Sequence, residues 1–262
     1  MNTVFERLQS SLQTTRFGKR IFFAPRIEST SDWARQLAEA GAEEGTVTVA
    51  QTQTGGRGRL GRQWISPQGG LWFSIILRPR QEPHDVAKLV FVTGLAVAEA
   101  LHKKYGLRTE TKWPNDVLIN GKKVCGILSE MNTKGQTVNY VIVGVGVNAN
   151  LHVEDDLPES LKTTSTSIMK ELSRKIRLGT LLKVLLEEME RIYDYYLKNG
   201  FALLLEKWKK HAVFLGRKVT ITNHNERLNG LALDVDVEGA LILKLEDETT
   251  RRILTGDVAL IS

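Results

Sequence analysis

The sequence has a single cysteine, Cys125, and its apolar residues never gather into a long run. A lone cysteine cannot form a disulfide within the chain. No stretch approaches the roughly 20 apolar residues that a membrane span needs, and the amino terminus has no apolar signal region. We therefore expect a cytoplasmic protein without membrane attachment.

Histidine is also scarce, and its spacing does not match that of metal ligands, so no structural metal site is expected. The five histidines are His84, His102, His152, His211 and His224. Internal repeats and low-complexity linkers are absent as well. What remains is the composition of an ordinary globular protein, with 262 residues, 42% apolar and 25% charged. That length suffices for one large domain and a small one.

The formal net charge is +6. Such a charge suits a nucleic-acid binder, a protein that handles phosphates, or one that docks on acidic partner domains. A solvated basic surface accounts for most of the 36 Lys and Arg residues. Charge alone therefore does not select a function.

Hydrophobic periodicity predicts helices and strands over most of the chain. The first helix is expected to begin at a Ser or Thr cap, to carry Trp33, Leu37 and Ala40 on one face, and to end at a glycine. The strand at 138–148 is expected to be central in its sheet. The expected helices span 31–40, 85–105, 176–198 and 201–211, and the expected strands span 46–50, 71–77 and 138–148.

Turn signals add a hairpin and a second domain. Asn-Gly at 120–121 lies between β-rich arms and predicts a type I′ turn. After Gly216, five short alternating segments joined by Gly, Asn and Asp turns are typical of a small all-β barrel. We place the boundary near Phe214, which gives domains 1–213 and 214–262.

The stretch GGRGRLGRQW at 55–64 raises a question of anion binding. Gly56, Gly58 and Gly61 fit G-x-G-x-x-G, but Pro67 and two further glycines precede a strand where that fingerprint requires a helix. A P-loop requires Lys and Ser or Thr where this loop has Arg-Gln. With both fingerprints excluded, the remaining interpretation is a flexible cationic loop that closes on an anion. A solvated basic turn or an Arg-Gly nucleic-acid segment has equal weight at this point.

Three further motifs favour a ligand site over a bare turn. They are KWPND at 112–116, GKKVCGILSE at 121–130 and GVGVN at 144–148. Together with EST at 28–30 and QTGGRGRLGRQW at 53–64, in this order and spacing, they closely resemble the biotin protein ligases. Each motif alone is weak, but the set is specific.

The resemblance extends from about Leu12 to the last residue. It implies an α+β fold, with a mixed-sheet catalytic domain like that of class II synthetases and a small C-terminal SH3-like β-barrel. It also implies an enzyme that uses ATP and Mg²⁺ to convert biotin to biotinoyl-AMP and pyrophosphate. That enzyme then transfers biotin to one lysine of a biotin carboxyl carrier protein domain.

Two expectations about assembly follow from the same resemblance. Members of the family often dimerise by joining sheets side by side, so a homodimer is expected among the states of this chain. Many bacterial members carry an amino-terminal winged helix-turn-helix domain, whereas only 28 residues precede Ser29 here. The chain thus resembles the monofunctional form, without DNA binding.

The resemblance also implies roles for single residues. Lys123 would position the reacting carboxylate, and Arg59 would order the loop over the adenylate, which makes both catalytic. Ser31 departs from the pattern, because many members have Asn there and serine has no amide. The implied biotin contacts are Ser29, Thr30, Ser31, Gln53, Arg57, Gly58, Arg59 and Lys123. The implied ATP contacts are Arg59, Trp64, Asn115, Asp116 and Asn148, with Asp116 also a ligand for Mg²⁺.

Each of these residues also has a simpler structural interpretation. Lys123 is otherwise a surface hairpin lysine like Lys122, Trp64 a core residue, and Ser29-Thr30 a helix cap. Cys125 falls in a buried strand without a histidine nearby in sequence, and no serine has a G-x-S-x-G elbow. Without an acyl-enzyme nucleophile, transfer is expected to run directly from the mixed anhydride to the carrier lysine.

Two rival functions remain. A lipoate or octanoate ligase would share the fold, but such enzymes usually lack the arginine-rich glycine loop followed by Trp. A basic nucleic-acid-binding protein would require aromatic residues to stack on bases, and the sequence after Gly216 has none.

Overall fold

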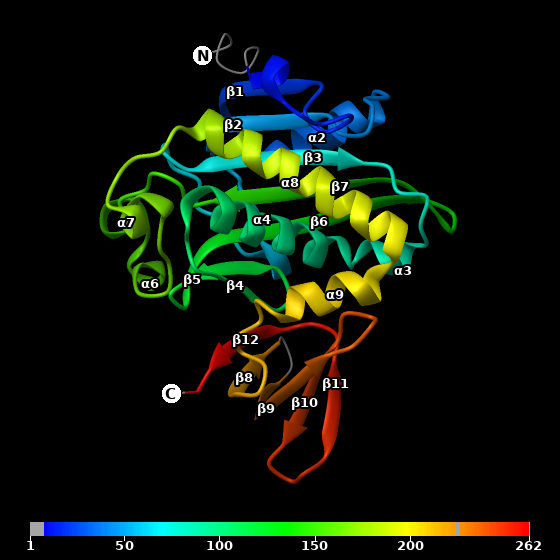
Figure 1. The fold of residues 1–262 in the computed structure, drawn as a ribbon, viewed down its shortest axis with the longest axis vertical. Coiled ribbons are helices and arrows are strands. Elements are labelled where there is room, and N and C mark those ends of the chain that lie inside the picture. The colour runs from blue at the N-terminus through cyan, green and yellow to red at the C-terminus, as the bar shows by residue number, and fades with distance from the viewer. Residues whose placement is uncertain (1–7, 224–225, 262) are drawn as a thin grey trace.

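The computed structural model describes residues 8–223 and 226–261. A seven-stranded sheet and its helices form the larger part, and a smaller five-stranded domain lies below it in Figure 1. The helices are α2 (Thr30–Glu39), α3 (Pro83–Val86), α4 (Leu89–Tyr105), α5 (Val153–Asp156), α6 (Glu159–Lys162), α7 (Ile168–Leu172), α8 (Leu178–Asn199) and α9 (Phe201–Lys209).

The large sheet has the strand order β1-β2-β3-β7-β6-β5-β4. Only β1 and β2 are parallel and the other neighbours are antiparallel, so the sheet is mixed. The expectation that β7 is central is confirmed. The strands are β1 (Ile21–Ile27), β2 (Val47–Gln53), β3 (Leu71–Leu77), β4 (Thr109–Lys112), β5 (Asp116–Ile119), β6 (Lys122–Lys134) and β7 (Thr137–Val147).

Strand β3 is buried along its whole length because both of its faces are covered. Phe73 and Ile75 point into the main core, whereas Ile76 packs with Ala34 of α2 on the opposite face. Ser74 shares the face of Ile76, since side chains alternate along a strand. A buried hydroxyl therefore lies beside α2, at the place where the site forms.

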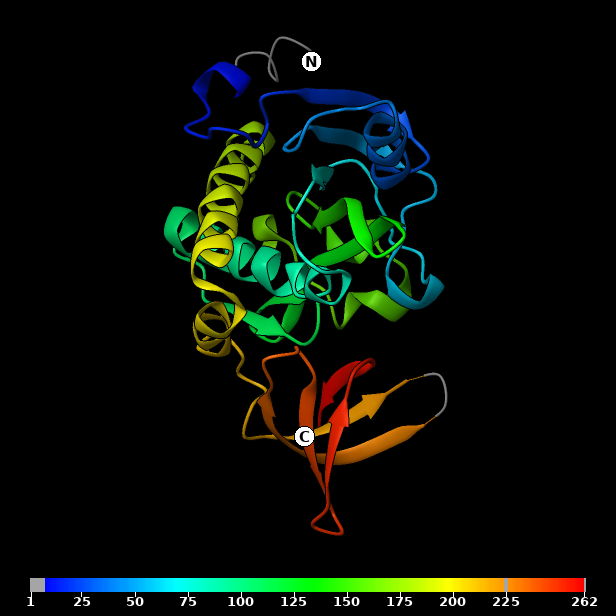
Figure 2. The same ribbon diagram turned by 90° about the vertical axis from the view of Figure 1, so that its right-hand side faces the viewer.

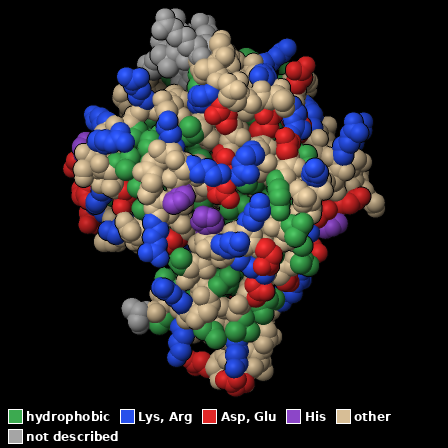
Figure 3. Space-filling model, viewed as in Figure 1, with side chains coloured by type: hydrophobic (Ala, Val, Ile, Leu, Met, Phe, Trp, Pro, Cys, Tyr) green, Lys and Arg blue, Asp and Glu red, His purple; other side chains and the backbone are tan. Residues whose placement is uncertain are grey.

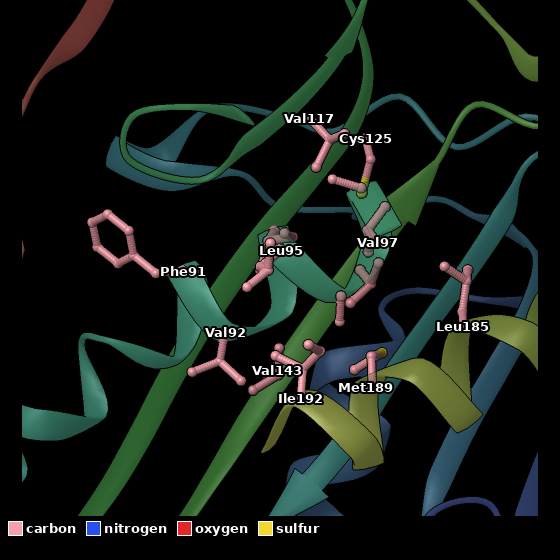
Figure 4. Close-up of a cluster of buried hydrophobic side chains, with 14 of the residues drawn as sticks. Phe91, Val92, Leu95, Val97, Val117, Cys125, Val143, Leu185, Met189 and Ile192 are labelled. Atoms are coloured by element: carbon pink, nitrogen blue, oxygen red, sulfur yellow. The ribbon is translucent and has the colours of Figure 1, made fainter. Parts of the chain in front are cut away.

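Helices α4 and α8 cover the other face of the sheet. Figure 4 shows Ile192 of α8 beside Val143 of the central strand, and Leu95 of α4 belongs to the same buried cluster. Phe91 extends the core toward α9, with its ring centroid 5.0 Å from that of Trp208. This core fixes the sheet as a rigid base for the opposite face.

The predicted helices and strands form, with several corrections. Helix α2 buries Thr30, Ser31, Ala34 and Ala38 most deeply. Small residues are required there because the helix lies close to the sheet. Of the expected apolar face, Trp33 and Leu37 are only partly buried and Ala40 is exposed.

The helix expected over 85–105 is also divided, into α3 and α4. The turn between them lets the buried Lys88 ammonium lie 2.8 Å from Asp85 and 3.2 Å from Glu238 of the smaller domain. A contact so distant in sequence leaves no periodic signal. Strands β1 and β4 were missed because neither shows clear alternation of apolar residues.

The hairpin and the five C-terminal strands are confirmed. The turn at 120–121 has positive φ at both residues, 52° and 72°, as a type I′ turn requires. The small sheet has the order β11-β10-β9-β8-β12, and each pair of neighbours is antiparallel. Its strands are β8 (Lys218–Thr222), β9 (Arg227–Val235), β10 (Leu241–Leu245), β11 (Thr250–Ile253) and β12 (Asp257–Leu260). The fold is therefore α+β, with a small C-terminal β-barrel.

Figure 2 shows this barrel below the large sheet, with the chain entering it after α9. Trp113 Nε1 donates to the Gly239 carbonyl (2.9 Å), and Lys209 Nζ lies 2.8 Å from Asp234 Oδ1. These contacts seat the barrel on the larger part. The boundary between residues 213 and 214 stays a prediction.

The molecular surface carries both signs of charge. On the face shown in Figure 3, Lys and Arg side chains are interspersed with Asp and Glu. Within the described ranges, no helix combines the length and apolar character needed to cross a membrane.

Candidate active site

A cavity of about 260 Å³ opens on the sheet face opposite α4 and α8. The glycine loop lies over it, and Asp257 of the barrel reaches its rim. All the site residues inferred from the sequence line this single cavity. They are Ser29, Thr30, Ser31, Gln53, Arg57, Gly58, Arg59, Trp64, Asn115, Asp116, Lys123 and Asn148.

Hydroxyl groups form one end of the cavity. The Ser29 side chain caps α2 by accepting from the Asp32 amide. Thr30 donates from both its amide and its hydroxyl to Gln53 Oε1, at 2.8 and 3.0 Å. Ser74 Oγ lies 2.8 Å from Thr30 Oγ1 and 3.1 Å from Ser31 Oγ. The three-residue segment 29–31 thus both caps the helix and contributes to the polar cluster, which Gln53 and Ser74 complete.

Arg57 is held by two carboxylates beside that cluster. Its guanidinium donates to both oxygens of Asp32, at 2.5 and 2.7 Å, and lies 3.5 Å from Glu130. The hydrogen bond from Arg57 lowers the pKa of Asp32, and the same bond raises the pKa of Arg57. Arg57 therefore stays charged at the cavity wall.

The remainder of the cationic loop turns sharply, and its predicted flexibility stays a prediction. Arg59–Gly61 form a single 3₁₀ turn, and Leu60 adopts a left-handed conformation with φ of 56°. The Gly58 amide donates to the Arg62 carbonyl (2.7 Å), which closes the turn. Arg59 Nη1 reaches Asn115 Oδ1 (3.3 Å) across the cavity.

Lys123, the second residue of β6, lines the cavity. Its Nζ lies 2.7 Å from Asp116 Oδ1 and 5.0 Å from the centroid of the Trp64 ring. Lys122, its neighbour, is not among the residues that line the cavity. The two lysines therefore have different surroundings, and the surface-lysine interpretation fits only Lys122.

Trp64 lies flat on the sheet over two glycines. Gly126 and Gly146 are directly paired across β6 and β7. A Cβ atom at Gly126 would lie 2.6 Å from the indole, and one at Gly146 would overlap it. The glycines are therefore required for the close approach of this ring.

Two asparagines tie backbone segments together at the other end of the cavity. Asn115 Nδ2 donates to the Ile127 carbonyl (2.7 Å), and Asn148 Nδ2 donates to the Thr166 carbonyl (3.1 Å). The Lys123 amide donates to the Thr164 carbonyl (2.8 Å). The base of Lys123 is thereby fixed between two segments.

Comparison with known proteins decides the family. The model "Biotin/lipoate A/B protein ligase family" matches residues 23–148, and "Biotin protein ligase C terminal domain" matches residues 214–260. The bifunctional ligase/repressor BirA of Bacillus spizizenii is 36% identical over 254 residues, which cover 97% of this chain and 78% of that protein. This chain belongs to the biotin protein ligase family.

Other members of the biotin protein ligase family are similar over most of their length. The biotin--[acetyl-CoA-carboxylase] ligase of Paracoccus denitrificans is 34% identical over 221 residues, covering 84% of this chain and 92% of that one. The biotin protein ligase of Aquifex aeolicus, solved in complex with biotin and ATP, has a TM-score of 0.79 and 29% identity. That match covers 93% of this chain and 99% of the Aquifex chain.

Sequence reasoning missed one wall of this biotin protein ligase cavity. Leu157, Leu161 and Ser165 line it, and Ser165 forms a parallel bridge with Lys123. The segment TTSTS at 163–167 has the composition of an ordinary loop and gave no indication of this role. Asp257 was missed for the same reason, since it begins an ordinary barrel strand.

The residues around Asp116 offer few ligands to a divalent cation. Its carboxylate already forms an ion pair with Lys123, and the described ranges contain no group of three His, Cys, Asp or Glu side chains suited to a metal. Mg²⁺ usually binds with substrate phosphates, several waters and only one or two carboxylates. The residues therefore fit a Mg²⁺ ion that arrives with ATP, not an ion held by the protein alone.

Proposed function

We infer that this protein is an ATP-dependent biotin protein ligase. It joins biotin to ATP to form biotinoyl-AMP and pyrophosphate, then transfers the biotinoyl group to a lysine of a biotin carboxyl carrier protein domain. The observation that carries this function is the single cavity in which the loop arginines, Lys123 and the hydroxyl cluster meet. The first family model covers both biotin and lipoate enzymes, but the second model and the named relatives favour biotin over lipoate or octanoate.

The first step brings two anions together. The biotin carboxylate must attack the α-phosphate of ATP, and the two groups repel one another unless cations lie between them. We assign this task to Lys123, with Arg59 ordering the loop above. Lys123 acts by position and charge, and no proton transfer at Nζ is required. The ion pair with Asp116 supports this role because it fixes the position of the ammonium among the residues that line the cavity.

Biotin recognition is proposed for the hydroxyl end of the cavity. Ser29, Thr30, Gln53 and the Arg57-Gly58 backbone would contact its polar ring system. Ser31 would contribute a hydroxyl where many relatives have an amide. Its place within hydrogen-bond distance of Ser74 supports a contact made through a shared hydroxyl network.

ATP recognition is proposed for the opposite end. Trp64 would lie against adenine, because its ring is held flat by the two glycines. Asn115, Asp116 and Asn148 would lie near the ribose and phosphates. Mg²⁺ would arrive on the phosphates and neutralise part of their charge, with Asp116 as its one protein ligand.

The second step needs no enzyme-bound acyl group. Cys125 is fully buried, and burial raises the pKa of its thiol. It does not line the cavity. The uncharged amine of the carrier lysine would attack the acyl carbon directly. The new amide C–N bond forms as the bond from that carbon to the AMP oxygen breaks, AMP leaves, and the proton lost by the amine passes to solvent.

A direct assay tests the function. Purified protein, ATP, Mg²⁺ and labelled biotin are incubated with a carrier domain, and we expect label on one carrier lysine by mass spectrometry. Lipoate and octanoate in place of biotin provide the matched comparison. Preferred transfer of either of these would replace biotin ligation with lipoate-type ligation.

The homodimer and the cytoplasmic location stay predictions. Light scattering of the purified protein tests the first of them.

A further inference from the structure

The turn between β11 and β12 reaches from the barrel to the glycine loop. Arg59 donates from Nη1 to the Gly256 carbonyl (3.2 Å) and from Nη2 to Thr255 Oγ1 (3.1 Å). Arg62 forms an ion pair with Asp257. Two of the three loop arginines therefore end on the barrel, which begins more than 150 residues later in the chain.

Asp257 lies between these two arginines. Its Oδ1 is 3.9 Å from Arg59 Nη1, and its side chain is 33% exposed at the cavity rim. Arg59 is more buried, with 20% of its side chain exposed. Burial lowers the pKa of the Arg59 guanidinium, and the carboxylates of Asp257 and Asp116 oppose that effect. Asp257 thus offsets part of the cost of burying the Arg59 guanidinium, which lines the cavity.

We propose that Asp257 is a positioning residue of the ligase, which holds Arg59 and Arg62 so that the barrel turn forms part of the lid over the adenylate. The proposal rests on the proposed function for its consequence, since retention of biotinoyl-AMP matters only in a ligase. The contact itself is independent of any ligand.

The barrel is also joined to the larger part by contacts that do not involve Asp257. The Trp113–Gly239 hydrogen bond and the Lys209–Asp234 ion pair join the barrel to the larger part without involving the loop. Asp257→Asn should therefore free the loop arginines and leave the barrel in place. Asp234→Asn is the matched control, because it removes a barrel ion pair that does not involve the loop.

The first experiment is limited trypsin digestion of the ligand-free protein, with cleavage after Arg59 and Arg62 followed by mass spectrometry. Asp257→Asn should increase the rate of cleavage about fivefold, because loss of one partly exposed ion pair shifts the opening equilibrium of the loop by about that factor. Asp257→Glu should restore slow cleavage, and Asp234→Asn should leave it at the wild-type rate. Equal cleavage in wild type and Asp257→Asn, or equal acceleration by Asp234→Asn, would overturn the proposal.

The second experiment measures retention of the intermediate. Asp257→Asn should release biotinoyl-AMP about fivefold faster, because lost contacts appear mainly in dissociation, whereas Asp234→Asn should release it at the wild-type rate. Arg59→Gly is the positive control for release. Unchanged release, or tighter ATP binding in Asp257→Asn, would show that the contact does not serve the lid. If wild type forms no biotinoyl-AMP, the proposed function fails, and the trypsin result still decides the loop contact.

Discussion

Lys123 and Lys122 are neighbours on β6, yet only Lys123 lines the cavity. Loss of one charge-assisted contact to a developing anion costs about 2.7 to 4 kcal/mol in the transition state. Lys123→Ala is therefore expected to slow adenylation about a hundredfold to a thousandfold. The measurement is the single-turnover rate of biotinoyl-AMP formation, alongside urea unfolding.

Lys122→Ala is the control for this prediction. We expect it to leave the adenylation rate near that of wild type. Lys123→Ala should also lose some stability, because Asp116, with 13% of its side chain exposed, is left without its ion-pair partner. The urea unfolding separates this loss of stability from the loss of rate. An equal loss of rate in both variants would place the reacting carboxylate elsewhere.

The residues of the cavity were predictable where they form motifs. The order of EST, the glycine loop, KWPND and GVGVN indicated Thr30, Gln53, Asn115 and Asn148, and these residues do meet. Their partners were not predictable in the same way. Asp257 pairs with Arg62 across 195 residues of sequence, and no local pattern encodes such a contact.

At the scale of single elements, β7 contributes residues to both of the proposed substrate ends of the cavity. Gly144 and Gly146 lie on the same face of the strand. A Cβ at Gly144 would lie 2.8 Å from Ser31 Oγ, whereas a Cβ at Gly146 would overlap the Trp64 indole. One strand therefore supports the proposed biotin end at one residue and the proposed adenine end two residues later.

Alanine at each glycine tests this division. Gly146→Ala should raise the KM for ATP about tenfold, because overpacking of a close contact costs about 1 to 3 kcal/mol. Gly144→Ala should raise the KM for biotin instead. Each variant is the control for the other, measured by pyrophosphate release with one substrate varied. A rise in the same KM for both variants would contradict the assigned ends.

The packing of α8 on α4 contains a charged cluster that makes stability depend on pH. Lys103 lies 2.7 Å from both Glu99 and Glu188, and Arg191 pairs with the same two carboxylates. Burial alone would raise the pKa of Glu188, but hydrogen bonds from Arg191 and Lys103 outweigh it and lower the pKa to about 2.

A carboxylate with a lowered pKa in the folded state stabilises the fold above its unfolded pKa. That contribution should be lost as the pH falls from about 4.5 to about 2. The unfolding free energy is therefore expected to drop by on the order of 2 kcal/mol from this group. Urea unfolding at several pH values measures the change. In Glu188→Gln, the unfolding free energy should depend less steeply on pH between about 4.5 and about 2. An unchanged pH dependence would assign the effect to other carboxylates.

Long periodic elements were predicted well, since burial of one face imposes its own spacing. The failures have tertiary causes. The break between α3 and α4 accommodates Lys88, whose partners include Glu238 of the barrel. Strand β4 has the sequence TETK and is held by pairing with β5, so its own composition gave no strand signal.

At the scale of the whole molecule, the sheet, the glycine loop and the barrel turn enclose one site from three sides. Such an enclosure suits a reaction with a reactive intermediate, because a mixed anhydride must be kept from water and from unintended amines. No nucleophile in the cavity is required to hold the acyl group. Activation and transfer should therefore be separable, and the carrier domain should be needed only for the second.

Isotope exchange tests this separation. With ATP, Mg²⁺ and biotin, labelled pyrophosphate should enter ATP in the complete absence of carrier, since biotinoyl-AMP formation is reversible while the intermediate stays bound. Omission of biotin is the control and should abolish the exchange. Addition of a carrier domain should then consume the intermediate and lower the exchange. Exchange that required the carrier would mean that the cavity is completed only by the carrier, and biotin activation by this chain alone would have to be abandoned.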